Sequence, residues 1–141
     1  MRNLTVLQGL PASGKSTWAK KIIERHKDVG QGAVRVNRDL LREMLTFSDW
    51  TPEFEEKVIA IEVMIASYFL NEDGYGVVIV DDVNLGEKAV KMWTEIAKTH
   101  KVNVQFNQTN VGVEECIRRD KKRKNSVGEK VIRKFAKLNK T

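Results

Sequence analysis

The sequence contains one cysteine, two prolines and 7% aromatic residues, and it has no long apolar run. With Cys116 alone, no disulfide can form within the chain, so nothing indicates an oxidising compartment. No apolar run approaches the roughly 18 residues that a membrane-spanning helix needs. These shortages predict a cytoplasmic protein without a membrane partner.

What the sequence does contain is enough for one domain, and its charge is unevenly placed. Its 141 residues, 41% of them hydrophobic, suit a single domain with its own core and exclude disorder. Residues 1–99 hold 13 lysines and arginines against 15 acids, whereas residues 100–141 hold 12 against 4. The excess predicts an anionic partner that meets the C-terminal third.

Short β-branched runs alternate with longer amphipathic stretches. The strand candidates are LTVL, AVRVN, GVVIVDD and VNVQF. The alternation predicts βαβ units, and therefore an α/β fold whose parallel sheet is covered by helices on both faces. Asn84 and Glu87 resemble a capping box that begins the helix after the third strand. In such folds, ligands bind beyond the carboxyl ends of the strands.

Residues 9–16, GLPASGKS, fit the pattern G-x-x-x-x-G-K-S without a gap. Such a loop directs backbone N–H groups at phosphate oxygens, and the following helix adds its positive N-terminus. Lys15 should reach the β and γ phosphates, and Ser16 should ligate Mg²⁺. Ala12 stands where this loop often has glycine, which is tolerable if the φ of Ala12 is negative. The residues predicted to hold the triphosphate are Gly9, Ala12, Ser13, Gly14, Lys15, Ser16 and Thr17.

GTPases, ATPase motors and small kinases share this loop. The chain is too short for most motors and lacks the N-K-x-D signature of guanine binding, which favours a small kinase. A kinase needs a base for the acceptor's proton, and Asp39, at the end of the second predicted strand, is suited to it. Arg42 would share its helix face. From spacing alone, a helix N-cap at Asp39 with Arg42 as its ion-pair neighbour is equally compatible.

Two further charged clusters lie at predicted element ends. Asp81 and Asp82 follow the third strand, and because side chains alternate along a strand, only one of them is expected to face the site. In residues 118–124, six basic residues accompany one acid. Arg119 and Arg123 are four apart, and one helical face bearing both suits a lid that grips the nucleotide. A solvated basic face or a nucleic-acid contact would explain the same residues.

In this order and spacing, the segments GLPASGKSTW, VNRDLLR, VDDVNL and RRDKKR resemble the 5′-kinase domain of bacteriophage polynucleotide kinases and their end-healing relatives. The resemblance covers nearly the whole chain. It implies a P-loop NTPase fold of the adenylate-kinase type, with a four-stranded parallel sheet and a C-terminal lid at about 113–127. It also implies transfer of the γ-phosphate of ATP, with Mg²⁺, to a 5′-OH end of DNA or RNA, by a phage-encoded protein.

The resemblance assigns roles to single residues. Lys15 and Ser16 match the family's phosphate-loop pair. Asp39 matches its general base, and Arg42 matches the arginine that binds the phosphate next to the acceptor nucleotide. On the same basis, the other expected site residues are Arg38 and Asp82 for the acceptor, Arg119 near the nucleotide and Arg123, acting with Lys15 at the transition state.

The resemblance also bears on organisation and partners. The D-x-D-x-T signature of an accompanying phosphatase is absent, so we expect one kinase domain over residues 1–141. A second copy of the chain and a ligase that seals the phosphorylated end are compatible partners. Two other functions stay open at this point. One is a small-metabolite or nucleoside kinase, and the other is a nucleic-acid-binding module with a regulatory nucleotide site.

Overall fold

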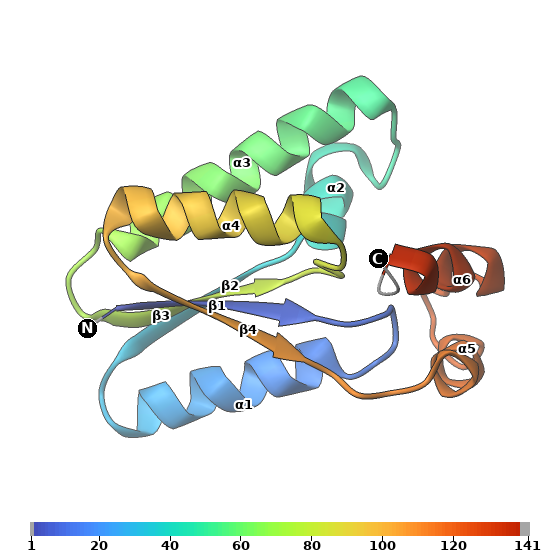
Figure 1. Ribbon diagram of the computed structural model, residues 1–141, viewed down its shortest axis with the longest axis horizontal. Coiled ribbons are helices and arrows are strands. Elements are labelled where there is room, and N and C mark those ends of the chain that lie inside the picture. Colours follow the sequence, from blue (N-terminus) through green and yellow to red (C-terminus); the bar gives the residue numbers. More distant parts are fainter. Residues whose placement is uncertain (1, 139–141) are drawn as a thin grey trace.

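In the computed structural model, which describes residues 2–138, four parallel strands form one sheet (Figure 1). The strands are β1 (Asn3–Gln8), β2 (Gly32–Val36), β3 (Tyr75–Asp81) and β4 (Asn103–Gln108), and they lie in the order β2-β3-β1-β4. The central strands β1 and β3 are buried on both faces, which is why their sequences are continuous apolar runs. The predicted α/β fold with a four-stranded parallel sheet is confirmed.

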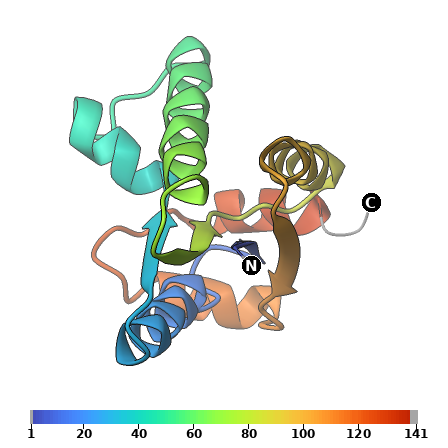
Figure 2. The ribbon, with the colours of Figure 1, turned by 90° about the vertical axis from the view of Figure 1, so that its left-hand side faces the viewer.

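Helices cover both faces of this sheet (Figures 1 and 2). On one face, α1 (Lys15–Asp28) packs Ala19 against Leu7 and Ile79. On the other face, α3 (Pro52–Leu70) and α4 (Glu87–His100) form the largest core cluster, around the fully buried Trp93. The short helix α2 (Arg38–Thr46) joins β2 to α3.

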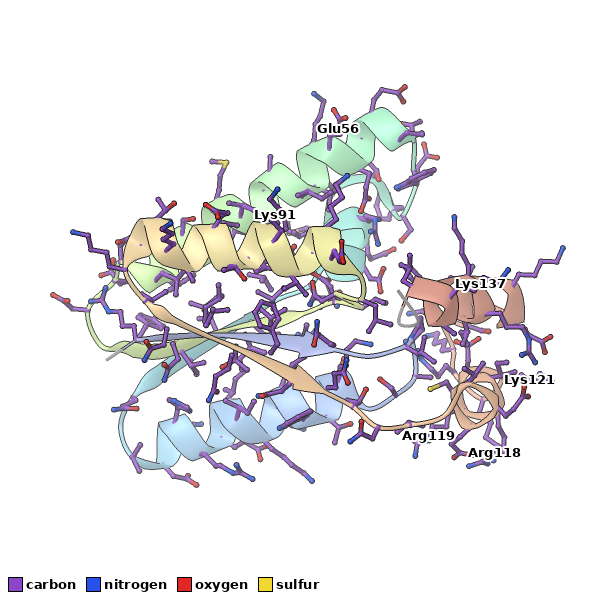
Figure 3. The ribbon with its side chains drawn as sticks, in the orientation of Figure 1. Glu56, Lys91, Arg118, Arg119, Lys121 and Lys137 are labelled. Carbon is purple, nitrogen blue, oxygen red and sulfur yellow. The ribbon has the colours of Figure 1, made fainter. Side chains whose placement is uncertain are left out.

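The last two helices, α5 (Val113–Asp120) and α6 (Glu129–Leu138), lie beyond the carboxyl ends of the strands (Figure 1). They have a small apolar cluster of their own, in which Cys116 and Ile132 are fully buried and contact Leu10 and Leu85. Figure 3 shows that Arg118, Arg119 and Lys121 lie at this end of the molecule, so positive charge of the C-terminal third gathers beyond the strand ends.

The capping box predicted from Asn84 and Glu87 is wrong. The residue before α4 is Gly86, and no side chain caps the helix. Asn84 instead adopts a left-handed conformation (φ 50) and is buried, and its Nδ2 donates to the carbonyl of Leu7 at 2.8 Å. Gln8 Nε2 donates to the Asn84 carbonyl at 3.1 Å. Asn84 therefore ties the ends of β1 and β3 together beneath the site.

Candidate active site

A cavity of about 750 Å³ opens at the carboxyl ends of the strands, between the residue 9–16 loop, α2 and the α5–α6 pair. Gly9 and Ser13 do not line it. The predicted residues that do line it are Ala12, Gly14, Lys15, Ser16, Thr17, Arg38, Asp39, Arg42, Asp82, Arg119 and Arg123. Segments far apart in the sequence thus meet at one place.

Gly9 and Ser13 lie on the other side of the loop, against the residue that follows β4. Thr109 Oγ1 donates to Ser13 Oγ at 2.7 Å. A Cβ atom at position 9 would lie 1.9 Å from that Thr109 oxygen, so the close approach requires glycine. These two residues fix the loop's position, and a direct part for them in nucleotide binding stays a prediction.

The condition of a negative φ at Ala12 is not met, because its φ is 67. The Ser13 amide donates to the Leu10 carbonyl at 3.1 Å, which closes a four-residue turn with Pro11 and Ala12 at its centre. Proline is favoured at the second position of a type II turn, and the third position requires a positive φ. Alanine accepts this conformation at a cost of roughly 1–2 kcal/mol relative to glycine.

Lys15 and Ser16 begin α1 at the base of the cavity. Lys15 Nζ donates to the carbonyls of Gly9 and Leu10 at 2.9 and 2.8 Å, so the ammonium is held inside the loop, where phosphate oxygens could take over those bonds. Burial lowers the pKa of Lys15, and the nearby Asp81 and Asp82 oppose that shift. Contact of Lys15 with the terminal phosphates stays a prediction.

Ser16 Oγ donates to Asp81 Oδ2 at 3.0 Å, and the same oxygen of Asp81 lies 3.3 Å from Arg35 Nε. Burial raises the pKa of the Asp81 carboxyl, against the lowering effect of Arg35 and the Ser16 hydroxyl. Because the Ser16 proton points at Asp81, the lone pairs of Oγ are free to face a cation. The donor set fits a Mg²⁺ ion held by Ser16. Within residues 2–138, no group of three or more His, Cys, Asp or Glu side chains forms a separate metal site.

Asp81 and Asp82 both line the cavity, so the expectation that only one of them faces the site is wrong. Asp81 is the last residue of β3 and reaches Ser16, whereas Asp82 reaches α2 and accepts the Arg38 amide at 2.8 Å. The strict alternation of a strand ends with the strand itself, and the chain turns after Asp81.

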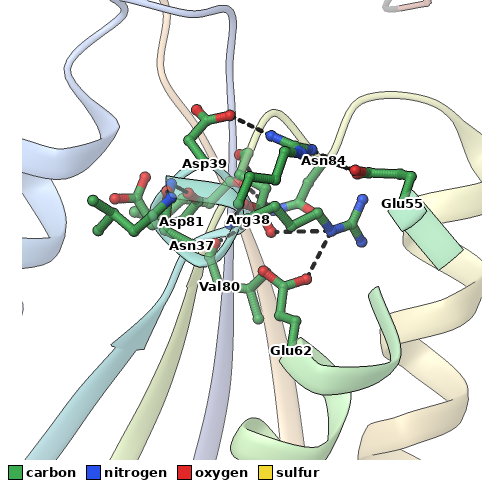
Figure 4. Close-up of polar contacts among 12 residues, drawn as sticks. Asn37, Arg38, Asp39, Glu55, Glu62, Val80, Asp81 and Asn84 are labelled. Atoms are coloured by element: carbon green, nitrogen blue, oxygen red, sulfur yellow. Dashed lines mark hydrogen bonds and ion pairs between the residues drawn. The ribbon is translucent and has the colours of Figure 1, made fainter. Parts of the chain in front are cut away.

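The start of α2 excludes the N-cap role considered for Asp39, whereas its role as the base stays a prediction. Asn37 is the N-cap, because its side chain accepts the Leu40 amide at 2.9 Å. Asp39 lies in the first turn and pairs with Arg42, with Oδ1 2.5 Å from Nη1 (Figure 4). Its side chain is 78% exposed at the cavity rim, where its carboxylate can accept a proton from an alcohol.

Arg42 has a second partner, Glu55, which sequence reasoning missed. Both Glu55 oxygens accept from Arg42, and Trp50 Nε1 donates to Oε2 of the same carboxylate at 2.9 Å. Burial favours the neutral form of Glu55, but the bonds from Arg42 and Trp50 outweigh it and hold the pKa of that carboxyl below its usual range. No motif indicates Glu55, because it lies in α3, thirteen residues from Arg42.

Arg38 extends toward α3, where its Nε donates to Glu62 Oε1 at 2.8 Å (Figure 4). Glu62 is fully buried, and sequence reasoning missed it as well. Burial, with the neighbouring Asp82 adding to it, raises the pKa of Glu62 to about 9. The available signal was a glutamate at an inner position of α3, four residues from Val58 and from Ala66, both of which are buried.

Arg119 and Arg123 both line the cavity, but they do not share a helical face as predicted, because α5 ends at Asp120. Arg123 lies in the turn that leads to α6. That turn is fixed by Asp120, whose carboxylate accepts from the Ser126 hydroxyl and from the amides of Val127 and Gly128 at 2.6, 3.0 and 2.9 Å. The single acid of the basic segment is thus its buried anchor. Movement of residues 113–127 as a lid stays a prediction.

The phosphate-binding loop between a buried strand and a helix, with an acidic residue behind its serine, defines a P-loop NTPase domain. The family model described as AAA domain matches residues 4–139, and the chain belongs to this family. No helix among the described residues is long and apolar enough to cross a membrane.

Two relatives resemble nearly the whole chain. One, from Autographa californica nuclear polyhedrosis virus, is named a bifunctional polynucleotide kinase/RNA ligase; the two are 29% identical over 98% of this chain and 21% of the viral one. The other is a chain of the Pnkp1/Rnl/Hen1 RNA repair complex, 26% identical with a TM-score of 0.80 over 99% of this chain and 44% of that one. This chain therefore spans less than half the length of either.

The Mycobacterium tuberculosis APS kinase CysC, solved with AMPPNP and APS, is 21% identical with a TM-score of 0.69, over 86% of this chain and 70% of that one. This likeness shows the fold alone. Together the comparisons confirm a P-loop kinase fold and the resemblance to polynucleotide kinases. An origin in a phage stays a prediction, and the viral relative is compatible with it.

Proposed function

We propose that the chain transfers the γ-phosphate of ATP to the 5′-OH end of DNA or RNA. One observation carries this proposal: Asp39 and Arg42, paired with each other, line the same cavity as Lys15 and Ser16. A carboxylate beside a guanidinium can serve one hydroxyl and one neighbouring phosphate, and a phosphate-binding loop lies within the same cavity. The basic charge of α5 and α6 at this end suits a polyanionic acceptor.

In the proposed transfer, Asp39 takes the proton of the 5′-OH while the oxygen of that hydroxyl forms a bond to the γ-phosphorus. The bond between that phosphorus and the β–γ bridging oxygen breaks, and ADP leaves. Lys15 and Arg123 offset the negative charge that spreads over the γ-phosphoryl oxygens. Mg²⁺ held by Ser16 would supply further charge stabilisation when bound.

Arg42 has donors to spare for the acceptor. A guanidinium carries five N–H groups, and Glu55 and Asp39 together take three of them. The two that are left can bind oxygens of the phosphate next to the acceptor nucleotide. This count supports an acceptor with a phosphate beside its free 5′-OH, which is a polynucleotide end or a 3′-phosphorylated nucleoside.

The names of the relatives suggest a biological setting. One is named for both a kinase and an RNA ligase activity, and the other belongs to an RNA repair complex. We infer that the chain prepares ends that a ligase then joins, because a 5′-phosphate is what it would add. A paired ligase is the proposed functional partner.

The test is transfer of label from γ-labelled ATP, with Mg²⁺, to a panel of acceptors. The panel holds 5′-OH DNA and RNA oligonucleotides, 3′-phosphorylated nucleosides, plain nucleosides and adenosine phosphosulfate. We expect label on the oligonucleotides and on the 3′-phosphorylated nucleosides. Label only on plain nucleosides or adenosine phosphosulfate would indicate a metabolite kinase and contradict the proposal. Tight, salt-dependent oligonucleotide binding without any transfer would indicate a binding module and contradict it as well.

A variant isolates the acceptor site within this assay. Arg42→Ala should weaken transfer to phosphate-bearing acceptors while ATP binding is unchanged. Arg25→Ala is the matched control, since Arg25 is exposed in the last turn of α1 and does not line the cavity. Normal acceptor kinetics in Arg42→Ala would remove Arg42 from the acceptor site.

A further inference from the structure

Two buried carboxyl groups meet beside the acceptor side of the cavity. Glu62 in α3 is fully buried, and the side chain of Asp82 is 9% exposed. One oxygen of each has a donor: Glu62 Oε1 accepts from Arg38 Nε, and Asp82 Oδ1 accepts from the Arg38 amide, both at 2.8 Å. The second oxygens, Glu62 Oε2 and Asp82 Oδ2, are buried without a hydrogen-bond partner.

Two unpaired buried acceptors side by side are unfavourable, because each has lost its water without gaining a donor. Both carboxyl groups contact the same Arg38 nitrogen, Nε, which lies 2.8 Å from Glu62 Oε1 and 3.6 Å from Asp82 Oδ2. Among residues 2–138, no donor makes a hydrogen bond to either of these oxygens. One hydrogen atom between the two oxygens would satisfy both, whereas two ionised carboxylates would satisfy neither and would repel each other.

The balance of charge around the pair points the same way. Arg38 from α2 is the cation that faces Glu62, and it serves Asp82 as well, with Nε 3.6 Å from Oδ2. Lys15 acts on Asp82 from the phosphate-binding loop, and Asp81 adds negative charge beside it. Glu55 adds negative charge near Arg38 from the same helix as Glu62. Two ionised carboxylates would carry two negative charges, and the shared Arg38 guanidinium offsets only one of them. A proton on one carboxylate removes the other charge.

We propose that Glu62 and Asp82 share one proton, which Glu62 Oε2 carries and donates to Asp82 Oδ2, and that Glu62 is thereby a positioning residue for the acceptor side of the site. The proton resides on Glu62 because Glu62 is the more deeply buried of the two. Burial raises the pKa of Glu62 to about 9, so the acid form persists at neutral pH. Asp82 is the acceptor of this bond, and the Arg38 amide and guanidinium face it.

This proton has a structural consequence for the next residue along the chain. Held by Glu62, the Asp82 carboxylate keeps one orientation and binds the first amide of α2, that of Arg38. Asp39 follows directly, so the pair fixes the turn that carries the proposed base. The effect on phosphate transfer rests on the proposed function, whereas the shared proton itself does not.

A spectroscopic experiment tests the proton without any assay of activity. The infrared difference spectrum between the wild type and Glu62→Gln at pH 7 should contain the carbonyl band of one protonated carboxylic acid. Glu56→Gln is the matched control, because Glu56 is exposed on the same helix and its replacement should remove no acid band. With ¹³C-labelled glutamate, the Glu62 carboxyl should titrate near 9. A midpoint near 4.5, or no acid band at pH 7, overturns the proposal.

Kinetics then separate positioning from mere packing. In Glu62→Gln, the amide N–H₂ can donate to Asp82 Oδ2 while its oxygen accepts from Arg38, so kcat should stay within about threefold of the wild type. Glu62→Leu keeps the volume but leaves Asp82 unpaired, and kcat should fall by roughly tenfold or more with ATP affinity unchanged. Equal kcat values in the two variants would overturn the positioning role.

The pH profile supplies a further distinction. Wild-type kcat should decline relative to that of Glu62→Gln as pH rises through about 9, because only the wild type loses this proton. Parallel profiles would contradict the positioning role. If Glu62→Leu fails to fold, the pH profiles still test the positioning role, and the infrared spectrum still tests the shared proton. If the wild type transfers phosphate to no polynucleotide, the proposed function fails while the infrared result still decides the shared proton.

Discussion

Arg42 and Glu55 form a bidentate ion pair: Arg42 Nε lies 2.8 Å from Glu55 Oε2, and Arg42 Nη2 lies 2.5 Å from Glu55 Oε1. Such a two-point contact fixes the plane of the guanidinium as well as its position. Trp50 Nε1 donates to Oε2 and orients the carboxylate in turn. Because Arg42 also pairs with Asp39, the proposed acceptor arginine and the proposed base both depend on a residue of α3.

Replacing Glu55 tests this dependence. Glu55→Gln keeps the shape but offers only one acceptor oxygen to two guanidinium donors, so Arg42 should lose its fixed orientation. We expect KM for a 5′-OH oligonucleotide to rise by roughly ten- to a hundredfold, in line with one lost charged hydrogen bond, with the Kd for ATP unchanged. Steady-state kinetics measure this, with Glu53→Gln in the exposed first turn of α3 as control. An unchanged KM would show that Asp39 alone orients Arg42.

The proposed base is tested by Asp39→Asn. Asparagine can still accept from Arg42 but cannot take a proton from the acceptor hydroxyl, so kcat should fall by about 10²–10⁴-fold while both substrates still bind. Single-turnover transfer to an oligonucleotide measures the chemical step. Asp49→Asn, at an exposed position beyond α2, is the control. Full turnover in Asp39→Asn would assign the base to another group.

Mg²⁺ dependence tests Ser16. Ser16→Ala removes the hydroxyl that donates to Asp81 but leaves the backbone of the loop in place. The Mg²⁺ concentration needed for half-maximal transfer should rise on the order of tenfold, as is usual when a group that orients a metal is lost. Titration of Mg²⁺ at fixed ATP gives this value, with Ser48→Ala as an exposed control. A superimposable titration curve would exclude Ser16 as a ligand.

The features that the sequence revealed are those encoded by contiguous residues. The phosphate-binding loop is eight residues in a row, and each strand is a short run whose composition indicates burial on its own. The clusters at residues 37–42 and 81–84 follow such strands directly. Since parallel strands end at one edge of the sheet, their convergence could be predicted without coordinates.

The features that the sequence did not reveal depend on packing between helices and strands. Glu55 and Glu62 lie on a helix that follows α2, and their partners are thirteen and twenty-four residues away. Which residues of α3 meet α2 is set by the angle at which the helix crosses the sheet, and no local pattern encodes that angle. The positive φ of Ala12 is hidden for a different reason, because the turn type that sets it follows from a backbone hydrogen bond between Ser13 and Leu10.

Asp120 provides a prediction that joins stability to the position of Arg123. Its buried carboxylate is the anchor of the turn between α5 and α6, through bonds from Ser126, Val127 and Gly128. Burial favours the neutral acid, but these bonds outweigh it and hold the pKa of Asp120 below its usual range. Asp120→Asn should lower the free energy of unfolding at pH 7 by about 1–3 kcal/mol, and kcat should fall because Arg123 loses its fixed turn.

The sign of the pH dependence follows from that lowered pKa. Above about pH 4 the carboxylate is ionised in both the folded and the unfolded chain, so its full stabilisation is present. As pH falls through the folded-state pKa, Asp120 becomes protonated and the stabilisation disappears. The gap in unfolding free energy between the wild type and Asp120→Asn should therefore be constant from pH 5 to 8, and it should narrow below about pH 4.

Denaturant unfolding at a series of pH values measures the gap, with the exposed Asp28→Asn as control. A gap that stays the same down to the most acidic conditions would mean that the carboxylate's charge contributes nothing to holding the turn.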